Sequence, residues 1–167
     1  MSEIQVVPTT DHHVAGFNHC VGVVARERRY IGFVDAPPLS ASEAFVRSVI
    51  DGRGAHFVAI DAAGNVVGWC DIARYPLEGF RHCGRLGMGL LPHVRGRGLG
   101  KRLATATIDA ARAEGIERIE LEVFATNAPA IALYERLGFV REGVRRRRRK
   151  LDGACEDEVL MALVSAP

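Results

Sequence analysis

The chain has 167 residues, a length that predicts one domain over residues 1–167 with a single buried core. Its 48% of hydrophobic and 25% of charged residues are typical of a soluble globular protein. The formal net charge of +2 is too small to indicate a nucleic-acid or membrane partner by itself.

Cysteine usage and the absence of a targeting pattern bear on the compartment. The four cysteines (Cys20, Cys70, Cys83 and Cys155) lie far apart without a Cys-x-x-Cys pair, which favours reduced thiols. We find no signal-peptide pattern and no run of about eighteen apolar residues, so we expect a cytoplasmic protein without a membrane partner. The six histidines lack metal-ligand spacing, and no metal site is predicted.

The first half of the chain predicts strands and helices in the order strand, helix, helix, strand, strand. A capping box, Ser40-x-x-Glu43, is expected to open the second helix. The turn at residues 61–65 joins the two later strands as a hairpin. The expected ranges are a strand at 4–7, a helix at 11–26, an irregular connection at 27–38, a helix at 40–52, and strands at 56–60 and 66–73.

Residues 83–100 form the stretch around which the chain is organised. An apolar run ends at Leu91 because Pro92 cannot continue a paired central strand. A glycine-rich turn follows at 95–100, and from Leu99 the apolar spacing is that of an amphipathic helix. A strand, a glycine turn and a helix N-terminus together make an anion site, because unpaired helix N–H groups point into the turn.

Two of three known glycine loops do not fit this turn. A nucleotide P-loop needs glycine where Arg95 stands and a hydroxyl where Arg102 stands. The dinucleotide fingerprint needs its third glycine at Lys101. What remains is Arg95-x-x-Gly98-x-Gly100 after a strand that ends in Leu-Leu-Pro; an ordinary strand-to-helix turn is the alternative.

A second motif follows at residues 118–139. Residues 118–125 alternate as a strand does, with Ile119, Leu121 and Val123 on one face. Asn127 then suits the N-cap of a short helix that Gly138 closes. The whole segment reads Asn-x-x-Ala-x-x-Leu-Tyr-x-x-x-Gly-Phe.

The chain ends in an expected hairpin, with strands at 139–149 and 155–163 around Asp152-Gly153, a strong type I′ turn signal. The run of basic residues at 145–150 has nucleic-acid binding as one explanation. Cross-strand charge pairing explains it sufficiently, so we expect no nucleic-acid partner. The expected pairs are Arg149 with Glu156, Arg148 with Asp157 and Arg147 with Glu158.

Together the two motifs resemble those of the GNAT superfamily of N-acetyltransferases, in which the first binds the acetyl-CoA pyrophosphate and the second flanks the thiol. The resemblance covers residues 4–163. It implies an α/β (α+β) fold with a mixed sheet of about seven strands and about four helices. It also implies that the strand ending at Leu91 and the strand beginning near Arg118 run parallel and then splay to admit acetyl-CoA.

The resemblance also implies a set of acetyl-CoA-binding residues. Within it, Leu90 lies on the pantetheine and the Met88 amide lies near the thioester oxygen. The full set is Met88, Leu90, Leu91, Arg95, Gly96, Arg97, Gly98, Leu99, Gly100, Lys101, Asn127 and Tyr134.

The chemistry needs a proton acceptor and a proton donor. An amine must be neutral to attack a thioester, and a carboxylate is the usual acceptor of its proton. Tyr134 stands where the family places the acid that protonates the leaving thiolate; a core aromatic residue is the alternative. Many family members place a glutamate on the strand before the loop, but residues 80–94 contain no carboxylate, and Arg85 occupies one plausible position.

The acceptor assignment therefore moves to the next strand. The Leu-Glu-Val triplet around Glu122, twelve residues before Tyr134, resembles the ribosomal-protein N-terminal acetyltransferases. Glu120 on the same strand face is the reserve candidate for the proton acceptor. The alternatives are that water accepts the proton, or that Glu120 and Glu122 are only solvated charges on the strand.

Within the superfamily the chain most resembles bacterial L-amino-acid N-acetyltransferases. This predicts acetyl-CoA-dependent acetylation of a small-molecule primary amine, without metal. The alternatives are a protein N-terminal acetyltransferase and a non-catalytic CoA-binding module. Specificity is expected from residues 27–38, residues 74–82 and the last hairpin, and a homodimer is left open.

Overall fold

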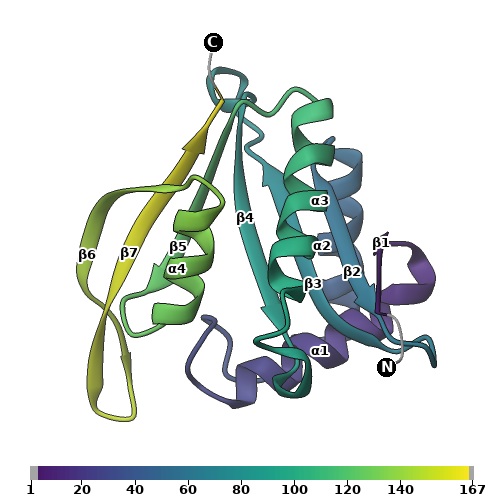
Figure 1. Cartoon of the computed structure of the whole chain (residues 1–167), viewed down its shortest axis with the longest axis horizontal. Helices are drawn as coiled ribbons and strands as arrows, with labels where there is room; N and C mark the ends of the chain where they lie inside the picture. The colour runs from purple at the N-terminus through teal and green to yellow at the C-terminus, as the bar shows by residue number, and fades with distance from the viewer. Residues whose placement is uncertain (1–3, 166–167) are drawn as a thin grey trace.

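The computed structural model describes residues 4–165 (Figure 1). This part of the chain forms seven strands and four α-helices in the order expected from the sequence. Residues 1–3 and 166–167 lie outside the described range, so the single domain over 1–167 stays a prediction. The elements are β1 (Gln5–Pro8), α1 (Val14–Arg26), α2 (Leu39–Asp51), β2 (Ala55–Ile60), β3 (Val66–Arg74), β4 (Cys83–Leu90), α3 (Leu99–Ala113), β5 (Arg118–Phe124), α4 (Ala128–Arg136), β6 (Val140–Leu151) and β7 (Ala154–Val164).

All seven strands belong to one sheet, in the order β1-β2-β3-β4-β5-β7-β6. β4 and β5 are parallel, and the other neighbouring strands are antiparallel. The mixed seven-stranded sheet with four helices, expected from the resemblance, is confirmed. None of the helices within residues 4–165 is long and apolar enough to span a bilayer.

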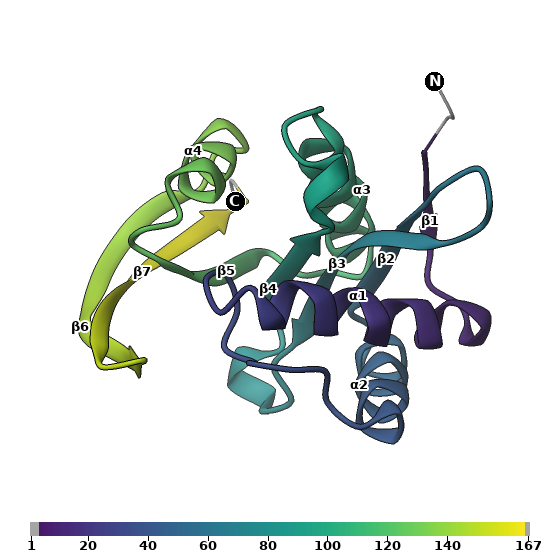
Figure 2. The same ribbon diagram turned by 90° about the horizontal axis from the view of Figure 1, so that it is seen from below.

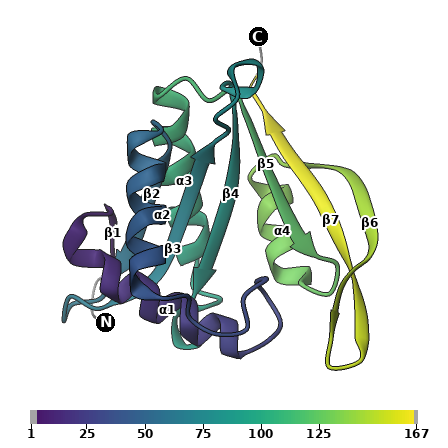
Figure 3. The same cartoon turned by 180° about the vertical axis from the view of Figure 1, so that it is seen from behind.

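Helices cover the two faces of the sheet unequally (Figure 2). α3 and α4 lie on one face. α1 and α2 lie on the other, where they cover the half of the sheet that ends at β4 (Figure 3). We call this second face the α1/α2 face; helices leave it uncovered over β5, β7 and β6.

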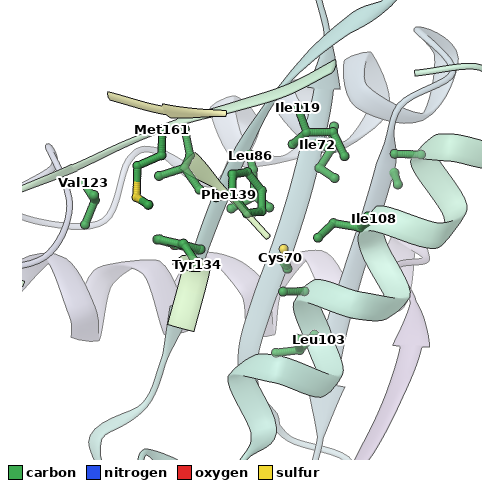
Figure 4. Close-up of a cluster of buried hydrophobic side chains, with 14 of the residues drawn as sticks. Cys70, Ile72, Leu86, Leu103, Ile108, Ile119, Val123, Tyr134, Phe139 and Met161 are labelled. Atoms are coloured by element: carbon green, nitrogen blue, oxygen red, sulfur yellow. The ribbon is translucent and has the colours of Figure 1, made fainter. Parts of the chain in front are cut away.

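Two hydrophobic clusters correspond to these two faces. The larger lies under α3 and α4, and Figure 4 shows part of it. The smaller lies under α1 and α2, where Phe17 packs edge-on against Trp69 with ring centroids 5.7 Å apart. Fully buried members of the larger cluster include Cys70, Ile72, Leu103, Ile116, Ile119, Leu121 and Met161.

The start of α2 differs from the sequence expectation. The helix is present, but the capping box predicted at Ser40 is wrong: the N-cap is Pro38, and no side chain caps it. Pro38 is held at φ −52° and ψ 142°, and its carbonyl accepts the Ala41 N–H at 2.9 Å. Proline therefore supplies the non-helical backbone of a cap by itself, and Ser40 lies inside the first turn.

The β6–β7 hairpin has the expected turn but a different register. Asp152 and Gly153 both have positive φ, as a type I′ turn requires. Arg149 pairs with Glu156 as predicted. The pairs predicted for Arg148 and Arg147 are wrong, because Arg145, not Arg147, lies opposite Glu158.

A bulge causes this shift. Three residues of β6 stand between the two register pairs, against one residue of β7, Asp157. Arg147 adopts φ 52°, and its N–H donates to Asp157 Oδ1 at 2.7 Å. The bulge places Arg145 opposite Glu158, and from there Arg145 also forms an ion pair with Glu122 of β5.

Candidate active site

The pairing between β4 and β5 ends partway along both strands. Within residues 4–165 they pair at three positions, the last being Arg85 with Glu120. β4 continues to Leu90 paired with β3, and β5 continues to Phe124 paired with β7 (Figures 1 and 3). The expected splay is confirmed, and it leaves one main-chain edge of β4 without a neighbouring strand.

The loop between β4 and α3 has the geometry of an anion site. Gly96 and Gly98 have φ of 72° and 77°, and Gly98 is the N-cap of α3. In the described chain, the N–H groups of residues 96–101 have no main-chain acceptor. A Cβ at either glycine would meet nothing within 4 Å, so glycine is needed there for its φ and for open space. These features fit the pyrophosphate of acetyl-CoA.

Arg95 faces away from this loop. Its guanidinium binds Glu27 through two hydrogen bonds, donates to the Leu90 carbonyl at 2.8 Å and 3.0 Å, and lies 4.8 Å from the centre of the Tyr30 ring. It therefore fastens the end of β4 to the segment after α1. Arg97 and Lys101 are exposed beside the loop, and the cofactor-binding role predicted for all three stays a prediction.

α4 brings Tyr134 to the region where the strands diverge. Asn127 caps the helix by accepting the Ala130 N–H at 3.3 Å. The packing of α4 beside α3 and β4 brings predicted cofactor residues together. A Cβ at Gly100 would lie 3.1 Å from Leu133 of α4 and 3.5 Å from Met88 of β4. α4 and the N-terminal end of α3 thus lie on the same face of the sheet, as Figure 2 shows.

Tyr134 combines a buried ring with an unengaged hydroxyl. The residue is 7% exposed, and its ring lies 5.7 Å from that of Phe139 (Figure 4). Within residues 4–165 its hydroxyl has no hydrogen-bond partner. Burial raises the pKa of the phenol, and the neighbouring Cys70 and Asp71 raise it further. The phenol is therefore protonated at neutral pH, as a proton donor must be.

The two glutamates predicted as proton acceptors lie on the α1/α2 face, and both are engaged. Glu122 binds Arg85 through Oε2, and its Oε1 accepts from Arg145 at 2.6 Å. Glu120 accepts from the Tyr75 hydroxyl at 3.0 Å and from Arg118 at 2.7 Å. Each carboxylate oxygen of Glu122 therefore already accepts from a guanidinium.

Segments distant in sequence surround this part of the sheet. Arg28 forms two hydrogen bonds with Asp152 at the tip of the last hairpin. Arg149 of the hairpin lies 4.0 Å from the centre of the Phe124 ring and donates to the Ile31 carbonyl at 3.4 Å. The connection after α1 and the last hairpin, both expected to set specificity, are therefore in contact.

Sequence reasoning missed Asp71. It lies on β3, opposite Gly87 of β4, and is 6% exposed. Desolvation raises its pKa to about 8, while Arg85 and the nearby Trp69 indole partly offset the rise. The available signal was a single carboxylate inside the apolar run of residues 66–73.

We expect Asp71→Asn to stabilise the protein at alkaline pH. The pKa is raised above the unfolded value of 3.8, so the native state binds more protons between about pH 4 and pH 8, and stability falls as pH rises through that window. Removing the charge should gain up to about 5 kcal/mol at pH 8 and little below pH 4. Urea unfolding of both proteins at the two pH values measures this. A variant less stable at both would mean that the carboxylate makes stabilising contacts.

Comparison with known proteins agrees with the geometry. Residues 24–139 match the acetyltransferase (GNAT) family. The protein yncA from Salmonella typhimurium, solved with its cofactor acetyl-CoA, superposes with a TM-score of 0.90 at 20% identity, covering 99% of this chain and 98% of that one. At that identity the likeness concerns the fold.

Two curated relatives differ in the substrate that their names state. N-alpha-acetyltransferase RimI of Mycobacterium tuberculosis is 38% identical over 103 residues, which are 59% of this chain and 61% of the relative. The L-methionine sulfoximine/L-methionine sulfone acetyltransferase of Pseudomonas paraeruginosa is 39% identical over 87 residues, 52% of this chain and 51% of the relative. The chain thus spans about half to three fifths of the length of these relatives. The family match, which covers more than half of the chain, is the decisive one: this chain belongs to the acetyltransferase (GNAT) family.

Proposed function

We propose that this protein transfers the acetyl group of acetyl-CoA to the primary amine of a small molecule, an amino acid or a related amine. The observation that carries the proposal is the β4 edge left free beyond Arg85, which leads into the unpaired N–H groups of residues 96–101. Acetyl-CoA supplies the activated acetyl group. The protein's residues hold it between the strands, orient the amine and move the protons.

In this proposal the two faces of the sheet have different tasks. Tyr134, on the face covered by α3 and α4, donates a proton to the departing thiolate. The amine enters from the α1/α2 face, which helices leave uncovered beside β5 (Figure 2). The sequence assigns the proton acceptor to Glu122, with Glu120 and water as alternatives.

The free state of all four cysteines supports a cytoplasmic location.

A protein N-terminus is the second candidate acceptor. It is favoured by the RimI relative and by the twelve-residue spacing between Glu122 and Tyr134. The contact between the segment after α1 and the last hairpin favours the small molecule. The Arg28–Asp152 ion pair and the hydrogen bond from Arg149 to the Ile31 carbonyl hold together two segments between which a peptide would have to pass.

A thiol-release assay separates the candidates. We expect amine-dependent release of CoA with L-methionine sulfone or another amino acid, and at least about tenfold lower kcat/KM with a peptide that begins with alanine. The reverse preference would indicate an N-terminal acetyltransferase. Acetyl-CoA binding by calorimetry without release across the amine set would indicate a CoA-binding module.

A further inference from the structure

We propose that the carboxylate of Asp71, rather than that of Glu122, accepts the proton of the attacking amine. Gly87 of β4 pairs with Asp71 of β3, and because glycine has no side chain it leaves the approach to the Asp71 carboxylate open. This inference rests on the proposed acetyl transfer and assigns one residue of its site.

The position of Asp71 is fixed by the sheet. Asp71 pairs with Gly87, two residues beyond Arg85, where the pairing between β4 and β5 ends. A Cβ at Gly87 would lie 3.3 Å from Oδ2 and 3.5 Å from Oδ1 of Asp71. The carboxylate therefore lies directly over the main chain of β4, beside the diverging strands.

The carboxylate is buried, and the hydrogen bond that helps to hold it comes from the neutral Trp69 indole. Within residues 4–165, no arginine or lysine forms an ion pair with it. A carboxylate that is 94% buried usually has a partner, because leaving it alone costs free energy. A carboxylate that holds one neutral donor keeps lone pairs for a partner that arrives with the substrate.

Asp71 and Tyr134 lie on opposite sides of the same stretch of β4. Asp71 shares the α1/α2 face with Trp69, whereas Tyr134 belongs to the cluster under α3 and α4. They are close enough for the Asp71 charge to affect the phenol. Acceptor and donor therefore flank the position where a group held between β4 and β5 would react.

This arrangement balances the transfer. The amine nitrogen forms a bond to the acetyl carbon, and the carbon–sulfur bond breaks. One proton passes from the nitrogen to the Asp71 carboxylate. The sulfur takes one proton from the Tyr134 phenol, which recovers it through solvent. Glu122, held by Arg85 and Arg145, acts as a positioning residue that keeps Arg85 beside the site.

The surroundings of Asp71 make it a stronger base than an exposed carboxylate. Burial raises its pKa to about 8, near the value of about 8 for a peptide α-amino group and within about 2.5 units of an alkylamine. The charged or titratable groups around it are Arg85 of β4, Cys70 of β3, Tyr134 of α4 and its cross-strand neighbour His56 of β2. Arg85 favours the charged carboxylate, but it also binds Glu122.

The test compares wild type, Asp71→Asn and the matched control Glu122→Gln. CoA release is measured with L-methionine sulfone and with an alanine-initiated peptide from about pH 6 to about pH 10. We expect Asp71→Asn to lower kcat/KM at neutral pH by about 10²- to 10⁴-fold, with the calorimetric Kd for acetyl-CoA within about threefold of wild type. The wild-type profile should rise with an inflection near pH 8, which Asp71→Asn removes and Glu122→Gln keeps.

A third variant tests access to Asp71 without removing its carboxylate. Gly87→Ala keeps Asp71 but crowds its carboxylate, so kcat/KM for the amine should fall while the inflection stays. Wild-type kcat/KM and pH profile in Asp71→Asn, together with loss of the inflection in Glu122→Gln, would overturn the assignment. Absence of amine-dependent release from wild type with both probes would overturn the proposed function itself, and the assignment with it.

Discussion

Replacing Tyr134 by phenylalanine is expected to lower kcat by about a hundredfold to ten-thousandfold, because the departing thiolate loses its positioned proton donor. The ring volume is kept, so packing against Phe139 and the affinity for acetyl-CoA should be retained. Steady-state kinetics at saturating acetyl-CoA and calorimetry of acetyl-CoA binding measure the two quantities. The loss should shrink with an acetyl donor whose thiol is more acidic, since that leaving group needs less protonation.

Tyr75→Phe is the matched control. Tyr75 also loses a hydroxyl, but that hydroxyl binds Glu120 on the α1/α2 face. Its removal should change kcat by less than about threefold, because it neither donates to the thiolate nor carries the amine proton. If Tyr134→Phe kept nearly full kcat with a verified amine, the phenol would serve only packing, and water would be the acid.

Gly98→Asp is expected to weaken acetyl-CoA binding by about tenfold to a thousandfold, which is about 1.4–4 kcal/mol. The new carboxylate would occupy open space at the N-cap of α3, where the dipole and the unpaired N–H groups attract an anion. The effect should appear in the calorimetric Kd and in KM for acetyl-CoA rather than in kcat.

Gly64→Asp controls for the backbone. Gly64 has φ 85° and open space around its Cβ position, but it lies in the β2–β3 turn. Both substitutions place an L-residue in the left-handed region and should cost a similar stability of about 1–2 kcal/mol. Unchanged affinity for acetyl-CoA in a folded Gly98→Asp protein would remove the loop from the cofactor site.

The sequence by itself determined the order of the elements and the two motifs. Each signal is local: Pro92 ends a strand, Asn127 caps a helix, and Asp152-Gly153 forms a turn through the conformations of the residues themselves. The alternation at 118–125 correctly put Glu120 and Glu122 on the face opposite the larger hydrophobic cluster. The one helix start that was predicted wrongly also has a local cause, because Pro38 forms the N-cap of α2 in place of the cap expected at Ser40.

Tertiary structure alone decided which charges are free. Arg95, assigned to the cofactor loop, is bound by Glu27, which lies 68 residues earlier in the chain. Glu122 is held by Arg85 of a parallel strand and by Arg145, which a bulge in β6 brings into register. Asp71 lies over Gly87 because β3 and β4 pair in one register, and a shift of one residue would turn its side chain to the other face. Sequence patterns record the preferences of neighbouring residues, whereas pairing register and long-range ion pairs depend on how the whole sheet packs, so the proton acceptor became identifiable only in the folded chain.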